Sequence, residues 1–165
     1  DDFRVERYIS VLPVEILVNS TYSQLFADTV FSDSFENSVL TWQGIPEDWS
    51  YFNWGTSGTY GNYGLSGNAS DGEKSVYLTG VSKSFAGFQS DYISRDDSAL
   101  GYTVTADIYI DENYANNPGI SLMLSSENGF LAKVNGTGIT ESFTKNSWVR
   151  VTAKFSKSEL DNYEY

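Results

Sequence analysis

The feature that most constrains this chain is a strict alternation of apolar and polar residues, clearest in stretches 102–110 and 148–155. Successive side chains of a strand point to opposite faces, so this pattern predicts half-buried strands. The stretch 120–124 alternates in the same way. We expect one set of side chains to face inward in an antiparallel sandwich: Val104, Ala106, Ile108, Leu122, Leu124, Val149, Val151 and Phe155.

Turn residues separate these stretches. Asn128-Gly129 and Asn135-Gly136 favour tight turns, and 75–78 and 85–93 are typical of further strands. Helical periodicity is nearly absent. The sequence therefore predicts an all-β, antiparallel jelly-roll β-sandwich. The glycine-rich stretch 55–72 has no periodic apolar face, and we expect a long surface loop there.

Residues 1–30 are expected to form a separate β arm. Two β-like segments, 5–12 and 14–18, are interrupted by Pro13, which lacks an amide donor. A strand pair of this kind needs a partner to pack on. We therefore predict an arm over 1–30 for attachment or homo-oligomerisation, and a sandwich over 31–165 truncated before its last strand.

The residue types present exclude several functions. The chain has no cysteine and no histidine, so disulfides, thiolate nucleophiles and histidine bases are excluded. A formal charge of −12 disfavours nucleic acid. No apolar run is long enough to predict membrane insertion. We therefore expect a binding or structural protein and no enzyme.

An aromatic cluster over residues 42–63 is the clearest sign of a ligand site. Flat rings stack on sugar faces, and neighbouring amides and hydroxyls bind sugar hydroxyls. The predicted ligand-binding residues are Trp54, Tyr60 and Tyr63, with Trp49 and Tyr51. Core packing is the alternative for Trp42, Trp49 and Phe52, and the sheet face that carries Tyr109 is a second location. The net charge predicts a neutral or cationic glycan.

The order of features over about residues 32–160 resembles carbohydrate-binding modules with a galactose-binding-like jelly roll. The segments concerned are Ser34-Phe35-Glu36-Asn37, Trp42 and Trp49, Gly72 to Leu78, Gly101 to Val104, and Asn146 to Thr152. This resemblance implies a sugar-binding sandwich. Sandwiches of the concanavalin type share much of this pattern, so the topology stays open.

The segment Arg4 to Leu12 resembles a short β-segment of tailed-bacteriophage structural proteins. The combined resemblance implies a non-catalytic virion structural or adhesion protein of fibre or decoration type. Its partners would be a cell-surface glycan and other virion subunits, and its location the virion or the extracellular space. The alternative is an accessory carbohydrate-binding module of a secreted bacterial glycan-degrading enzyme or adhesin.

Acidic turn residues suggest a structural calcium ion, which needs several oxygen ligands. The candidate ligands are Asp33, Glu36 and Asp71. The resemblance implies a calcium site near the first strand of the sandwich, to which Glu36 corresponds.

Overall fold

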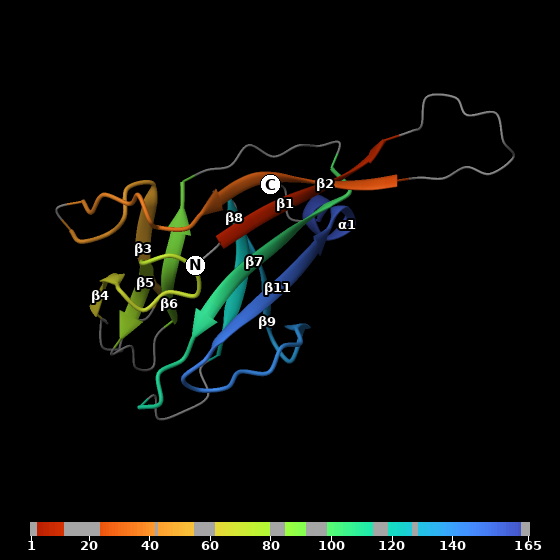
Figure 1. Cartoon of the computed structure of the whole chain (residues 1–165). Coiled ribbons are helices and arrows are strands. Elements are labelled where there is room, and N and C mark those ends of the chain that lie inside the picture. Colours follow the sequence, from red (N-terminus) through yellow and green to blue (C-terminus); the bar gives the residue numbers. More distant parts are fainter. Residues whose placement is uncertain are drawn as a thin grey trace, which may run out of the picture. The chain divides into compact units, whose positions relative to one another are not determined.

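The computed structural model describes residues 3–11, 24–41, 43–54, 62–79, 85–91, 99–113, 119–126 and 129–162. Most of these residues lie in strands, which confirms the predicted all-β fold (Figure 1). The elements are β1 (Phe3–Val11), β2 (Gln24–Asp33), β3 (Trp49–Trp54), β4 (Asn62–Ser66), β5 (Ser75–Thr79), β6 (Phe85–Ser90), β7 (Gly101–Tyr109), β8 (Ser121–Ser126), β9 (Gly129–Asn135), β10 (Gly138–Ile139), β11 (Trp148–Ser156) and α1 (Lys157–Asp161). The jelly-roll connectivity stays a prediction.

The chain divides into two compact units. One covers Asp33–Ile93 with the first two residues, and the other covers Phe3–Ser32 and Ser94–Tyr165. Strands β3 to β6 belong to the first unit. The second unit contains β1, β7 to β11, α1 and nearly all of β2.

The first unit contains two antiparallel strand pairs, β3 with β6 and β4 with β5. In both pairs, an aromatic ring of one strand lies over a glycine of the opposite strand. A Cβ on Gly64 would lie 3.1 Å from the Tyr77 ring, and a Cβ on Gly87 would lie 3.1 Å from the Phe52 ring. The ring of one strand thus covers the surface that a glycine leaves open on the other.

Strand β4 contradicts the predicted loop over 55–72, because residues 62–66 pair with β5. Glycine weakens a strand by itself, which is why the sequence favoured a loop here. Tyr77, directly opposite Gly64, supplies the missing side-chain contact. Residues 55–61 lie outside the described residues.

The second unit contains a four-stranded sheet in the order β11-β7-β1-β2. Strands β7 and β11 pair over their whole lengths in antiparallel register, with Val151 opposite Ala106 and Phe155 opposite Tyr102. The inner face of this sheet forms the core. Val104, Val151 and Phe155 are at most 1% exposed.

A second sheet of this unit has the order β10-β9-β8. Strands β8 and β9 form the expected hairpin, with Ser126 opposite Gly129. The short strand β10 pairs with β9 in parallel. Strand β8 contacts β7, and strand β10 contacts β11, so the two sheets enclose one core. Of the eight residues expected to face inward, Val104, Leu122, Val151 and Phe155 are buried, and Ala106, Ile108, Leu124 and Val149 are half-buried.

Strand β1 lies within the four-stranded sheet, between β7 and β2. Arg4 pairs with Thr105, and Tyr8 pairs with Gly101. The predicted arm thus contributes an interior strand to the sheet of the second unit. Its role in attachment or homo-oligomerisation stays a prediction.

Helix α1 follows β11 directly and was not expected from the sequence. Ser156 caps it: its hydroxyl accepts a bond from the Glu159 amide at 3.3 Å, and Glu159 accepts one from the Ser156 amide at 2.8 Å. This reciprocal pair is a capping box, and Ser-x-x-Glu was its sign in the sequence. Among the described residues, no helix has the length and apolar character needed to cross a membrane.

Candidate functional site

The outer face of the four-stranded sheet, opposite the core, carries a ladder of polar and aromatic pairs. Directly paired residues of neighbouring strands share one face. The outer face therefore consists of the rungs Tyr109–Trp148, Asp107–Arg150, Thr105–Thr152 and Thr103–Lys154, with Arg4 of β1 beside Thr105. These rungs alternate with the rungs of the inner face, so the core fixes the orientation of the outer side chains. Thr103 is itself 3% exposed, so the fourth rung reaches solvent through Lys154.

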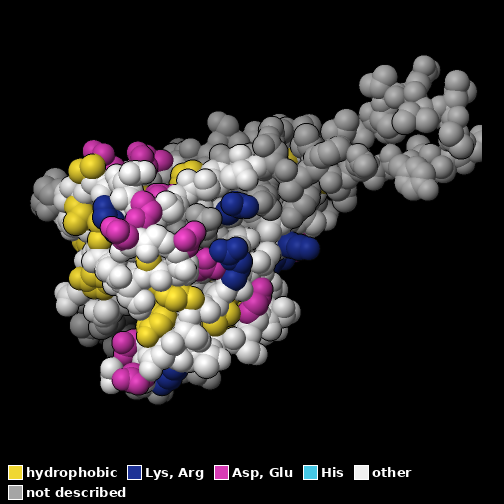
Figure 2. All heavy atoms as spheres, in the orientation of Figure 1, with side chains coloured by type: hydrophobic (Ala, Val, Ile, Leu, Met, Phe, Trp, Pro, Cys, Tyr) yellow, Lys and Arg dark blue, Asp and Glu magenta, His cyan; other side chains and the backbone are white. Residues whose placement is uncertain are grey.

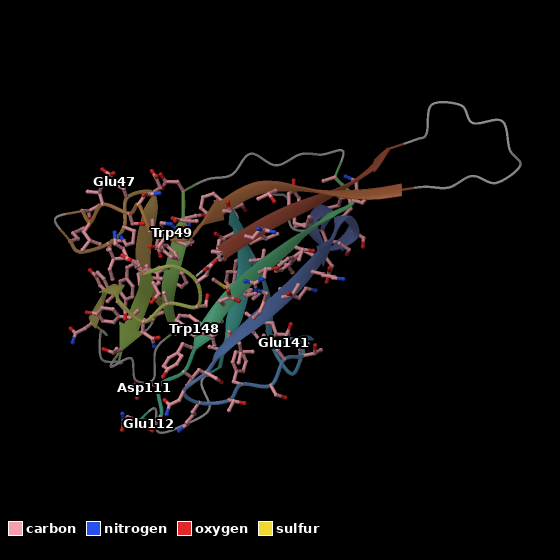
Figure 3. The ribbon with its side chains drawn as sticks, viewed as in Figure 1. Glu47, Trp49, Asp111, Glu112, Glu141 and Trp148 are labelled. Atoms are coloured by element: carbon pink, nitrogen blue, oxygen red, sulfur yellow. The ribbon has the colours of Figure 1, made fainter. Side chains whose placement is uncertain are left out.

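An aromatic pair forms one end of the outer face. The ring centroids of Tyr109 and Trp148 are 5.4 Å apart, and the ring planes are inclined by 50°. Both residues are half-buried, so part of each ring surface reaches solvent. Tilted rings of this kind form a shallow apolar corner. Figure 3 shows Trp148 near the loop that contains Asp111 and Glu112.

The next rung is a bidentate ion pair. The Arg150 Nε lies 2.8 Å from Asp107 Oδ1, and the Arg150 Nη2 lies 2.7 Å from Asp107 Oδ2. Fork-to-fork pairs of this kind fix both side chains. The Asp107 side chain is 7% exposed and that of Arg150 is 62% exposed. The covered carboxylate therefore holds in place a guanidinium that extends into solvent.

Asn146 supports the aromatic end of the face. Its backbone has a φ of 57°, and its amide donates to the Ile110 carbonyl at 2.8 Å. Its Oδ1 accepts bonds from the Tyr109 hydroxyl at 3.3 Å and from the Glu112 amide at 3.0 Å. Its Nδ2 donates to Glu112 Oε2 at 2.8 Å. One side chain thus connects the Tyr109 ring to the loop that follows β7.

Glu141 covers part of the outer edge of β11, the edge strand of this sheet. The Thr152 amide donates to Glu141 Oε1 at 3.0 Å, and the Thr140 amide donates to Oε2 at 3.0 Å. An exposed strand edge invites pairing with another chain. The Glu141 carboxylate accepts the Thr152 amide of this edge, so that amide is not available to pair with another chain.

The aromatic residues predicted to bind ligand lie in the first unit. Tyr51 and Tyr63 stack with centroids 4.5 Å apart and planes 26° apart, and both contact Phe88 edge-on. Trp49 packs on Phe35 at 5.3 Å. The side chain of Trp54 and all of Tyr60 lie outside the described residues.

In the stacked pair, each tyrosine ring has one face covered by the other ring. Because the two rings stack, the face that each ring turns toward the other is not open to a sugar. Both residues are half-buried. Trp49 is fixed by Asp33, whose Oδ2 accepts the indole N–H at 2.6 Å. These contacts are ring packing among half-buried residues of the first unit, and ligand binding by Trp49, Tyr51 and Tyr63 stays a prediction.

The predicted calcium ligands bind backbone amides. Glu36 Oε1 accepts the amides of Glu73 and Lys74, each at 2.8 Å. These two bonds, that of Lys74 first, lower the pKa of the Glu36 carboxyl. A Cβ on Gly72 would lie 2.4 Å from Glu36 Oε1, so the loop approaches this carboxylate at a glycine with a φ of 73°.

Asp33 and Asp71 also accept local amides. Asp33 Oδ1 accepts the Phe35 amide at 2.7 Å, and Asp71 Oδ1 accepts the Gly72 amide at 3.0 Å. Within the described ranges, no three acidic residues gather as a metal site would require. Calcium binding stays a prediction, and the contacts seen here explain these carboxylates as loop anchors.

The outer face was only partly foreseen. The alternation placed Trp148, Arg150 and Tyr109 on the polar side of their strands, and Tyr109 marked a second location for the site. The pairing of Trp148 with Tyr109 depends on the register of two strands about 40 residues apart in sequence, which alternation alone does not determine. Comparisons with protein-family models, curated proteins and solved structures give no match.

Proposed function

We propose that this chain is a non-catalytic glycan-binding module of a structural or adhesion protein, and that the outer face of the four-stranded sheet binds the sugar. The observation that carries this proposal is the tilted Tyr109–Trp148 pair directly beside the Asp107–Arg150 rung. Sugar sites combine an apolar platform with a few fixed polar groups. These two rungs provide both in adjacent positions.

The geometry suits stacking on one ring with an edge contact to the other. A sugar laid on Trp148 would have its hydroxyls near the Arg150 side chain, one rung further along β11. Two residues along a strand correspond to about 7 Å. The ion pair with Asp107 holds the guanidinium in place, so its ordering costs little entropy when the sugar binds.

The wider setting proposed is a virion protein of fibre or decoration type. Its support is the resemblance of the segment 4–12 and of the sandwich, and it extends to homo-oligomers assembled through residues 1–30. A mass measurement by light scattering on the purified chain tests the oligomer. A monomer at all concentrations would favour the alternative, an accessory module of a secreted enzyme or adhesin.

Replacing Trp148 with Ala tests the site. Burying a large ring against a ligand contributes about 1.5–3 kcal/mol, so we expect glycan affinity to fall by about tenfold or more. The measurement is a glycan array followed by calorimetry on the best sugar. Phe130→Ala is the matched control, because Phe130 is a 47% exposed ring on β9, in the other sheet. Equal affinity in the Trp148 variant would contradict the proposed site.

The residues predicted first provide the competing location. If the sugar binds at the segment 49–63, Trp54→Ala abolishes binding and Trp148→Ala does not. The two variants therefore give opposite results for the two locations. Melting temperatures measured in parallel distinguish lost binding from lost folding.

A further inference from the structure

Three basic residues of this acidic chain lie on the outer face. The whole chain has 10 basic and 22 acidic residues. The outer face of the sheet carries Arg4, Arg150 and Lys154, all exposed. Figure 2 shows Lys and Arg side chains over the region of β1, β7 and β11, with Asp and Glu side chains between them.

Among the described side chains, one carboxylate, Asp107, lies in the rungs of this face, and Glu141 lies at the edge of β11 beside Thr152, so the three cations outnumber these two carboxylates. Asp107 is bound to Arg150 and is 7% exposed, so little of its charge faces solvent directly. An approaching ligand therefore meets the exposed guanidinium of Arg150 before it meets the Asp107 carboxylate.

The cations lie on a line with the aromatic pair. Along β11 the outward residues follow the order Trp148, Arg150, Thr152, Lys154. Trp148 and Lys154 are six residues apart on one strand, which corresponds to about 20 Å. A single sugar cannot span this length, whereas an oligosaccharide laid along β11 would contact the rings, the guanidinium and the ammonium in turn.

We propose that the glycan bound on the outer face is an anionic oligosaccharide, with one unit on Tyr109–Trp148 and acidic groups of the following units near Arg150 and Lys154. This inference rests on the proposed function and specifies its ligand class. It differs from the neutral or cationic sugar that the net charge predicted. Guanidinium and ammonium groups bind carboxylate and sulfate alike, so both acidic groups enter the test.

The experiment uses two matched pairs of probes on the full chain. Tetragalacturonate is compared with its methyl ester, and dextran sulfate with dextran, by calorimetry at low salt and in 0.5 M NaCl. We expect the acidic member of at least one pair to bind about tenfold more tightly at low salt. That advantage should shrink in salt, because screening shortens the reach of charges between exposed groups. The pair that shows it identifies carboxylate or sulfate.

Substitution of single cations gives the residue-level test. Lys154→Gln removes an exposed charge, and we expect about threefold weaker binding of the acidic probe, within the range of exposed ion pairs. The neutral probe should be unaffected. Arg150→Gln should weaken the acidic probe at least as much, with its melting temperature measured because Asp107 loses its partner. Lys157→Gln, on α1, is the control and should leave the binding of both the acidic and the neutral probe unchanged.

Three results would overturn this inference. The neutral member of each pair could bind as tightly as the acidic one, or Lys154→Gln could leave the acidic probe unchanged. Polyglutamate, a polyanion without sugar rings, could also displace the acidic glycan at equal charge concentration. In all three cases a loss of neutral-sugar binding in Trp148→Ala would still support the proposed function. Absence of binding by every sugar would refute both.

Discussion

Glu159→Gln should destabilise the chain at neutral pH and lose that effect in acid. The Glu159 carboxylate bonds the Lys133 ammonium and the Ser156 amide, and these bonds lower its pKa from 4.5 to about 2. Lys133 also lies over the Phe155 ring, 5.6 Å from its centroid. The pair thus connects β9 to the buried end of β11 and to the first turn of α1. Glutamine still fits a capping box, so the substitution mainly removes charge.

The size of the effect follows from exposure. A carboxyl whose pKa is depressed by folding stabilises the folded state above its unfolded pKa, and this contribution is lost as pH falls through the folded pKa. Here the window runs from pH 4.5 down to about 2. The Glu159 side chain is 38% exposed, so solvent screening limits the contribution to about 1 kcal/mol. That corresponds to a melting-temperature change of about 2–4 °C.

Urea unfolding at a series of pH values, followed by circular dichroism, measures this contribution. We expect the free energy of unfolding of wild type and Glu159→Gln to differ by about 1 kcal/mol at pH 7 and to converge toward pH 2. Lys133→Met should show the same loss at pH 7. Lys157→Gln is the control, since its pair with Asp161 spans 3.6 Å between exposed groups. A difference of constant size from pH 7 to pH 2 would refute the reasoning.

Two further predictions concern folding. Gly72→Ala should lower the melting temperature, because the new Cβ would lie 2.4 Å from Glu36 Oε1 and the φ of 73° disfavours a side chain; we expect a loss of about 1–3 kcal/mol. Gly67→Ala, with no atom within 4 Å of its Cβ, is the matched control, and equal losses would contradict the argument. Deleting residues 1–30 removes β1 and residues 24–30 of β2 from the four-stranded sheet, so we expect an aggregated or unfolded product by size exclusion. A folded, soluble deletion product would instead support a detachable arm.

Alternation predicted the parts of the fold in which burial is one-sided. In β7 and β11 the apolar residues other than Tyr109 and Trp148 face the core and the polar residues face outward, so the sequence itself carries the orientation. Val151 and Phe155, placed inward by this pattern, are almost fully buried. The hairpin of β8 and β9 was predicted for the same reason, with turn residues to mark it.

The parts that the sequence did not predict depend on contacts between distant segments. Strand β4 contains Gly64, and the ring that compensates for it belongs to Tyr77 on another strand. The interior position of β1 depends on its pairing with β7, about 100 residues away in sequence. Helix α1 is too short to show a period, and only the local pair Ser156 and Glu159 indicated it. One-sided burial produces a periodic pattern in the sequence of a single strand, whereas pairing between distant strands produces none.

The proposed ligand class depends on local charge, whereas the neutral or cationic glycan was predicted from the sum of charges. A net charge of −12 describes the field far from the chain, whereas a bound sugar responds to groups within about a Debye length, roughly 10 Å at 0.1 M salt. On the outer face the exposed charged groups of β11 are Arg150 and Lys154, and in the Asp107–Arg150 pair the guanidinium, not the carboxylate, faces solvent. The net negative charge of the whole chain would still slow the approach of a polyanion from a distance. An anionic glycan should therefore associate slowly at low salt, yet be held by charge once it lies along β11, and its association and dissociation rates should both rise with salt.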